Sequence, residues 1–284
     1  MSNATIDQTG EGIASVAARF GGSVVGVGRG WRVGSGAIVA PGVVLTAARH
    51  ADPEGTTVTL ADGSRVAGEV AGVDRERGIA AVRAETGEAQ PLEWAPADLE
   101  VAIGTPLYAL SNPGGRGLRV TAGHVSAAPR SIRGPRGRRM SGAIEHTAAL
   151  PRGSAGGPLV DADGRIVGIN LLRTEGGLIL ALGAASGLRD AAERLARGEE
   201  IERPTLGIAV APPWVARKMR RAVGLSERDG LLVRGVEDDS PAGKAGIERG
   251  DLIVAAAGND VDGIDALHRS LESAGEGLAL TVVR

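Results

Sequence analysis

Residues 144–160 read IEHTAALPRGSAGGPLV, and no other stretch says as much about the fold of the chain. Alternating apolar and polar residues lead into a glycine-rich loop, and a short apolar run follows the loop. GRIVGIN at 164–170 comes next, and Asp163-Gly164 separates the two apolar runs. An Asp-Gly dipeptide between such runs is typical of a hairpin turn. The stretch therefore predicts short antiparallel strands joined by tight turns.

Similar runs, each bounded by Gly, Pro or Asp, occupy the chain as far as residue 182. They lie at 23–27, 36–40, 42–46, 56–60, 64–72, 78–83, 106–110, 118–127, 142–148, 157–160, 165–171 and 177–182. Many short strands at close intervals predict an all-β barrel or sandwich. Glycine, with 45 residues, supplies the positive-φ positions that turns need. Aromatic residues make up only 2%, so aliphatic side chains must fill the core.

The pattern changes near residue 200. The segment 187–198 predicts a helix that ends at Gly198, and the charged residues before Pro204 predict a linker. Strands and helices then alternate. The strands are expected at 205–211, 230–236, 250–256 and 278–283, and the helices at 213–223, 240–246 and 263–274. A chain of 284 residues is long enough for two domains of ordinary size, and we predict them at 11–198 and 204–284.

The order of short motifs resembles the HtrA family of serine proteases, also called DegP-like. In the first domain the motifs are GSGAIVAPGVVLTAA at 34–48, GVDRERGIAAV at 72–82, IGTPLYALSNPG at 103–114, VTAGHVSA at 120–127 and the stretch 144–160. In the second they are TLGI at 205–208, SPAGKAGIERGDLIVAAAGNDV at 240–261 and LHRSLESAGEGLALTVVR at 267–284. The resemblance implies a mainly β protein, a trypsin-like double β-barrel followed by an α+β PDZ domain.

The three side chains on which the family's catalysis depends are missing. A serine protease of this kind needs a hydroxyl nucleophile, an imidazole base and a carboxylate that orients the imidazole. The resemblance aligns these roles with Ala155, Arg49 and Gly78. A guanidinium group has no acceptor and stays protonated, so it cannot act as a general base. The sequence therefore predicts a catalytically inactive HtrA-like pseudoprotease.

The loop around the missing nucleophile keeps its glycines. Gly153, Ser154 and Ala155 correspond to the family's oxyanion loop, whose backbone N–H groups stabilise negative charge. The simpler interpretation is that the glycines suit the turn. A retained pocket for an anion or a peptide carboxylate is the alternative hypothesis.

Two other functions stay open at this point. In the first, the chain is an active serine endopeptidase in which each role has moved to a nearby residue: His50, Asp74 and Ser154. Neighbours on a strand or tight turn point in opposite directions, which argues against this shift. In the second, the chain is an interaction protein that uses the arginine-rich segment 116–139 to bind an acidic partner or nucleic acid. The resemblance implies that this segment includes a loop between two barrel strands. This segment has no interleaved aromatics to stack on bases.

The predicted PDZ domain indicates peptide binding. A peptide would add as a strand, and the turn at Leu206-Gly207-Ile208 would bind the terminal carboxylate through its N–H groups. Leu206, Gly207, Ile208 and Val210 would line one side of the groove, and Leu267 and Leu271, four residues apart on one helix face, would line the other. The expected partners are C-terminal or extended apolar peptides of proteins.

Composition sets the remaining expectations. The net charge of −2 gives no bulk attraction to nucleic acid or membranes, and no cofactor is expected. The chain has no cysteine, and His124 and His146 show no metal-ligand spacing, so no metal site is expected. The N-terminal residues lack the pattern of an export signal, which predicts a cytoplasmic location for the sequence as written and an exported or anchored one if a signal has been trimmed away. A homotrimer is possible in this family, but Phe20 and Trp31 are the only aromatic residues near the N-terminus.

Overall fold

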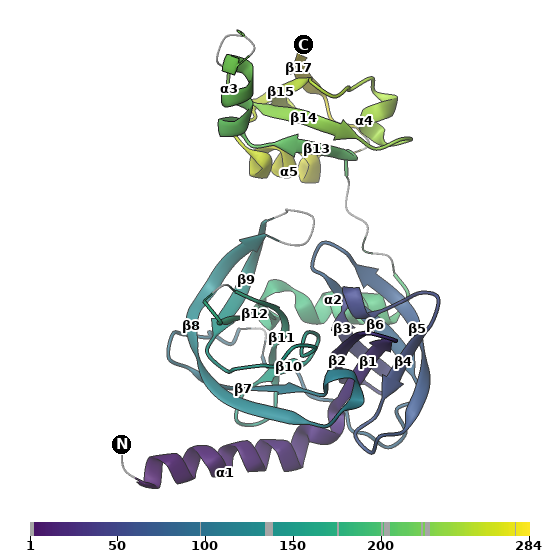
Figure 1. The fold of residues 1–284 in the computed structure, drawn as a ribbon, viewed down its shortest axis with the longest axis vertical. Helices are drawn as coiled ribbons and strands as arrows, with labels where there is room; N and C mark the ends of the chain where they lie inside the picture. Colours follow the sequence, from purple (N-terminus) through teal and green to yellow (C-terminus); the bar gives the residue numbers. More distant parts are fainter. Residues whose placement is uncertain are drawn as a thin grey trace. The chain divides into compact units, whose positions relative to one another are not determined.

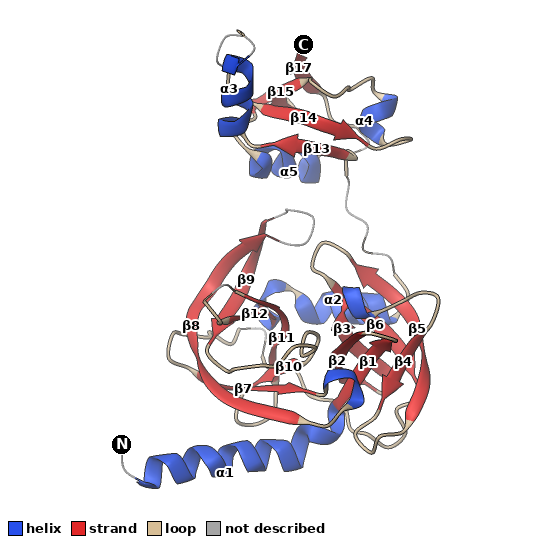
Figure 2. Cartoon of the chain, viewed as in Figure 1, coloured by secondary structure: helices blue, strands red, loops and turns tan. Residues whose placement is uncertain are grey.

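The structure is a computed structural model that describes residues 3–96, 98–133, 139–174, 176–199, 201, 205–222, 224, 228–275 and 277–284. The chain divides into two compact units, Met1–Ile201 and Glu202–Arg284. The first unit consists mainly of strands, and the second combines a sheet with helices (Figures 1 and 2).

The first unit begins with the helix α1 (Asn3–Phe20) and a closed six-stranded barrel, in the order β1-β2-β3-β6-β5-β4. Its strands are β1 (Val24–Arg29), β2 (Arg32–Ala40), β3 (Val43–Ala47), β4 (Thr56–Thr59), β5 (Arg65–Asp74) and β6 (Ile79–Ala84). Neighbouring strands are antiparallel. The short helix η2 (Ala48–His50) follows β3 directly, so the residues after β3 lie at one end of this barrel.

A second closed barrel follows, in the order β10-β11-β12-β9-β8-β7. Its strands are β7 (Pro106–Ser111), β8 (Arg119–Arg133), β9 (Arg139–His146), β10 (Pro158–Val160), β11 (Ile166–Arg173) and β12 (Ile179–Gly183). The one-turn helices η1 (Gly21–Ser23), η3 (Pro113–Gly115) and η4 (Ala184–Ser186) connect elements, and α2 (Leu188–Ala196) ends the unit. α2 contacts β5 and β6 of the first barrel.

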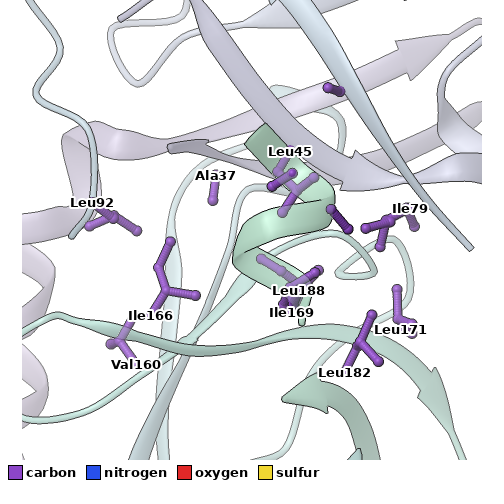
Figure 3. Close-up of a cluster of buried hydrophobic side chains, with 14 of the residues drawn as sticks. Ala37, Leu45, Ile79, Leu92, Val160, Ile166, Ile169, Leu171, Leu182 and Leu188 are labelled. Carbon is purple, nitrogen blue, oxygen red and sulfur yellow. The ribbon is translucent and has the colours of Figure 1, made fainter. Parts of the chain in front are cut away.

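The largest hydrophobic cluster joins the two barrels. Leu45 and Ile79 from the first barrel share it with Ile169 and Leu182 from the second, and Leu188 of α2 completes it (Figure 3). Each of these five side chains is fully buried. Because aliphatic side chains form this cluster almost alone, the barrels pack together without an aromatic core.

The second unit has a sheet in the order β13-β14-β15-β16, with β17 paired to β15. The strands are β13 (Ile208–Ala211), β14 (Leu231–Val236), β15 (Leu252–Ala256), β16 (Asn259–Asp260) and β17 (Leu280–Val283). The helices are α3 (Pro213–Ala222), α4 (Pro241–Lys244) and α5 (Ile264–Ser273). β13 pairs with β14 alone among the described strands, so one of its edges is open.

The predicted fold class is confirmed: two six-stranded barrels precede a unit with the sheet and helices of a PDZ domain. In the arginine-rich segment 116–139, residues 119–133 form β8 and pair with β7 and β9, so the strand predicted at 118–127 extends further along the chain than expected. Residues 134–138 of that segment lie outside the described residues. The domain bounds 11–198 and 204–284 stay predictions. No helix in the described part of the chain is long and apolar enough to cross a membrane.

Candidate functional site

The glycine-rich loop between β9 and β10 is fixed by contacts from both barrels. The Ser35 hydroxyl of β2 donates to the carbonyl of Gly153 (3.0 Å) and accepts from the Asn112 N–H (3.0 Å). The Ser35 N–H donates to the carbonyl of Ala155 at 3.0 Å. On the other side, the Gly156 N–H donates to Asn170 of β11 at 2.8 Å. The loop therefore lies where the two barrels meet.

Arg49 and Gly78, which the resemblance aligns with two positions of the family's triad, lie on segments that a backbone hydrogen bond joins. The Ala48 N–H, one residue before Arg49, donates to the carbonyl of Gly78 at 2.8 Å. The Arg49 guanidinium extends to the second barrel, where its Nη2 donates to the Leu171 carbonyl at 2.9 Å. Partial burial lowers the pKa of Arg49 from its ordinary value. An arginine remains cationic at neutral pH under such a shift, so this position carries a positive charge.

The backbone at Gly78 has a conformation that suits glycine. Its φ is +72°, and its N–H donates to the Asp74 carbonyl at 2.8 Å, which closes the turn between β5 and β6. Residues with a Cβ atom rarely adopt such angles. The backbone conformation at this position therefore favours a residue without a side chain.

Ala155 directs a partly buried methyl group to the cluster between the barrels. The next residue has no room for a side chain. A Cβ atom on Gly156 would lie 2.1 Å from the Ser35 carbonyl oxygen and 2.7 Å from the Ala47 nitrogen. The loop is therefore packed against the end of β3, two residues before Arg49.

The structure does not bring His50, Asp74 and Ser154 together. The Ser154 hydroxyl lies 3.0 Å from the Ser111 hydroxyl, and both side chains are buried. The Asp74 carboxylate pairs with Arg77 at 2.8 Å and also accepts N–H groups of its own turn. Each of the three side chains has different surroundings.

His50 packs on the backbone of β2, where a Cβ atom at Gly34 would lie 2.2 Å from the ring. Both ring nitrogens are buried without a hydrogen-bond partner. Burial, with a smaller contribution from the charge of Arg49, lowers the pKa of His50 to about 4. The ring is neutral at pH 7, and it contacts neither a hydroxyl nor a carboxylate through a hydrogen bond.

His146 stabilises the glycine-rich loop through Asn170, a role that the sequence does not predict. Its Nε2 lies 2.8 Å from Oδ1 of Asn170, and the Asn170 amide donates to the carbonyls of Gly157 and Pro158. Burial lowers the pKa of His146 and outweighs the hydrogen bond with Asn170, which raises it. Both residues are almost fully buried, so they form a polar support under the loop.

The residues predicted for peptide binding gather around β13 and α5 in the second unit. Leu206, Ile208, Val210 and Leu267 belong to one hydrophobic cluster, and Leu271 of α5 is also buried. Gly207 has a φ of +68°, and its carbonyl accepts the Glu237 N–H at 2.8 Å. Within the described residues, the N–H groups of Leu206 and Gly207 have no acceptor.

Known proteins similar to this chain agree with the architecture. Residues 34–169 match the trypsin-like peptidase domain family, and residues 232–284 match the PDZ domain family. A probable periplasmic serine endoprotease DegP-like from Brucella suis is 31% identical over 88% of this chain and 50% of its own length. The putative serine protease HhoA of Synechocystis is 33% identical over 87% of this chain and 66% of its own length.

The fold also matches a solved structure of the HtrA-type protease AlgW with a decapeptide. The TM-score is 0.70, the identity is 22%, and the match covers 96% of this chain and 94% of the other. At this level of identity the likeness supports the fold alone. The chain spans about half the length of the DegP-like relatives.

The prediction of a cytoplasmic location is wrong. The DegP-like relatives, from Brucella suis and from Halomonas elongata among others, are named as periplasmic proteins. The sequence argument failed because the residue pattern of one N-terminal segment does not determine the compartment of a protein. With a trypsin-like peptidase domain, a PDZ domain and DegP-like relatives, the chain belongs to the HtrA-like family.

Proposed function

We propose that this chain is an exported HtrA-like protein that binds peptides through its PDZ unit and does not hydrolyse them by a catalytic triad. The observation that carries the proposal is the combination of Arg49, Gly78 and Ala155 at the positions aligned with base, orienting carboxylate and nucleophile. Removing the triad from a serine protease costs on the order of a millionfold in kcat. The relatives named as serine endoproteases make proteolysis the competing function.

The surroundings of the nearby candidates support the proposal. A general base must reach the nucleophile's proton through a hydrogen bond. His50 has no hydrogen-bond partner, and Ser154 is bonded to Ser111 instead. An imidazole with a pKa of about 4 is also a weak base at neutral pH.

Peptide binding rests on the open edge of β13 and on the turn before it. An extended peptide can pair with an open strand edge, and unpaired N–H groups can bind its terminal carboxylate. Leu206 and Gly207 supply such N–H groups, and the partly buried Ile208 and Val210 lie beside the buried Leu267. This arrangement fits an extended peptide that ends in an apolar residue.

The first experiment measures cleavage of casein and of a fluorogenic peptide by the full chain and by its Ala155→Ser variant. Neither protein should show turnover above a heat-denatured control, because Arg49 and Gly78 supply neither base nor orienting group. Robust cleavage by the unmodified chain would refute the proposal. Robust cleavage by the Ala155→Ser variant would contradict the roles assigned to Arg49 and Gly78.

The second experiment measures binding of a fluorescent peptide with an apolar C-terminal residue to the full chain. The same peptide with a C-terminal amide is the matched control. Loss of the charge-assisted hydrogen bonds should weaken binding about tenfold. Equal affinity for both peptides would exclude capture of the carboxylate by the turn at Leu206-Gly207.

A further inference from the structure

Two arginines converge on one end of β11, where the two barrels meet. Arg49 reaches the Leu171 carbonyl from the first barrel. Arg173, two residues further along β11, donates from its guanidinium to the Leu150 carbonyl in the segment that leads to the glycine-rich loop. The two contacts place one guanidinium group at Leu171 of β11 and the other at Leu150, before the glycine-rich loop.

Neither guanidinium has a carboxylate partner among the described residues. The buried carboxylate of Asp74, in the turn before the predicted orienting position, is paired with Arg77. Arg49 and Arg173 are both exposed, and each uses one printed hydrogen bond of the five N–H donors that a guanidinium has. The junction of the barrels therefore presents two cationic side chains without a carboxylate partner among the described residues.

The loop between these arginines adds main-chain donors. The N–H groups of Gly153, Ser154 and Ala155 have no acceptor within the described residues. Gly153 has a φ of +83°, and its carbonyl accepts a hydrogen bond from the Ser35 hydroxyl. Successive N–H groups in a glycine-containing turn form a concave site for anions.

Contacts described above tie these donors to Arg49. Gly156 is packed against Ala47, and the Gly156 N–H bonds to Asn170, the residue before Leu171. We propose that a peptide carboxylate binds at this junction of the barrels, between the guanidinium of Arg49 and the N–H groups of Gly153 to Ala155, with Arg173 as a second cation. The proposal rests on the proposed function, because it requires that a peptide bound here is not hydrolysed.

The chemistry favours a carboxylate over other groups. Guanidinium binds planar carboxylates through two parallel hydrogen bonds, and the remaining oxygen lone pairs suit main-chain N–H donors. The carboxylate can be an acidic side chain or the C-terminus of a chain. The same donors serve both sources, so the experiment must separate them.

The test uses the full chain and three labelled peptides that share one Ala- and Ser-rich sequence. The first contains glutamates and has blocked ends, the second has glutamines and a free C-terminus, and the third has glutamines and blocked ends. Fluorescence anisotropy measures their binding to the unmodified chain, to Arg49→Gln and to Arg49→Lys. Arg65→Gln removes an exposed arginine of β5 and is the matched control.

We expect Arg49→Gln to weaken binding of at least one carboxylate peptide about tenfold, as loss of a charge-assisted pair predicts. Arg49→Lys should keep part of the affinity, and Arg65→Gln should keep all of it. Weaker binding of the first peptide identifies an acidic side chain as the ligand, and weaker binding of the second alone identifies a C-terminus. If neither peptide responds to Arg49→Gln, the inference is wrong.

A measurement on the unmodified chain guards against a misfolded variant. Titration with the first peptide should shift the amide resonances of Gly153 and Ala155 in a ¹H–¹⁵N spectrum, whereas the third peptide should leave them in place. Unshifted resonances at saturation would overturn the inference. Such a failure would not affect the two parts of the proposed function, which are peptide binding by the PDZ unit and the lack of cleavage. Conversely, cleavage by the unmodified chain would refute the proposed function without changing the response to Arg49→Gln.

Discussion

The hydroxyl groups of Ser154 and Ser111 lie 3.0 Å apart inside the second barrel, with side chains that are 3% and 0% exposed. This pairing directs the Ser154 hydroxyl away from solvent, although Ser154 directly precedes Ala155 in the glycine-rich loop. A nucleophile must reach a substrate, and Ser154 instead satisfies another buried hydroxyl.

Ser154→Ala should therefore reduce stability and leave reactivity unchanged. Leaving the Ser111 hydroxyl without its partner should cost about 1–2 kcal/mol. Urea denaturation measures this loss, and Ser64→Ala, which removes an exposed hydroxyl bonded to Asp62, is the control with a smaller cost. Labelling by a fluorophosphonate that disappears in Ser154→Ala would instead support the hypothesis of an active enzyme with shifted catalytic residues.

Gly156→Ala should be among the most damaging changes in the loop. Its φ of +90° disfavours a side chain, and the new Cβ atom would overlap the Ser35 carbonyl oxygen. We expect a loss of more than about 3 kcal/mol, from steric strain and from lost hydrogen bonds.

Gly63→Ala is the matched control for this loss. Its φ is +87°, but a Cβ atom there meets no atom within 4 Å. The control should lose only about 1 kcal/mol, the cost of the backbone conformation alone. Equal losses at positions 156 and 63 would show that contact with Ser35 does not constrain the loop.

Asn170→Ala should lower the stability of the fold by removing the support of the glycine-rich loop. The substitution removes the Asn170 amide from its contacts with His146, Gly157 and Pro158 and leaves buried polar atoms without partners. A loss of about 2–4 kcal/mol is expected. Asn259→Ala removes an exposed amide with one local bond and should cost far less. A small loss at Asn170 in thermal unfolding would contradict the support assigned to it.

Stability should fall on mild acidification, with His50 as one cause. Its folded pKa of about 4 lies below the ordinary value of 6.5, so the unfolded chain binds more protons between these values. The free energy of unfolding should thus decrease as the pH falls from about 6.5 to about 4, and His50 should add no further decrease below that window.

His50→Gln should flatten part of this slope. Since the ring is only partly shielded from solvent, we expect His50 to account for about 1–2 kcal/mol over the window. His146, whose pKa burial also lowers, contributes in the same direction and remains in the variant. Urea titrations at several pH values measure the slope, with exposed His124→Gln as the control. An unchanged slope in His50→Gln would contradict the buried neutral ring.

Local sequence patterns predict most elements of this fold. Alternating runs bounded by Gly or Asp place the strands within a few residues, and Asp62-Gly63 and Asp163-Gly164 lie at the predicted hairpins β4–β5 and β10–β11. β16 was missed, because two residues give no periodic signal. The helix α1 begins at Asn3, whereas the periodic apolar residues start near Ile13. The residues before Ile13 show no apolar periodicity, so the sequence does not predict the first part of this helix.

The site is harder to predict because its contacts are distant in sequence. Arg49 and Leu171 are 122 positions apart, and no pattern around either residue indicates their hydrogen bond. The pairing of Ser154 with Ser111 has the same character. The resemblance predicts which side chains align with the family's catalytic positions, whereas the direction of each neighbouring side chain depends on how two closed barrels meet.

The Ser35 contacts separate what this loop must keep from what it can lose. Ser35 joins the loop to both barrels through its hydroxyl and its N–H, and every one of these bonds ends on a main-chain atom. A change of the side chain at position 155 leaves all of them in place. The bonds that hold this loop in place therefore do not depend on whether position 155 carries a hydroxyl or a methyl group, and the frame of the domain is independent of the chemistry at that position.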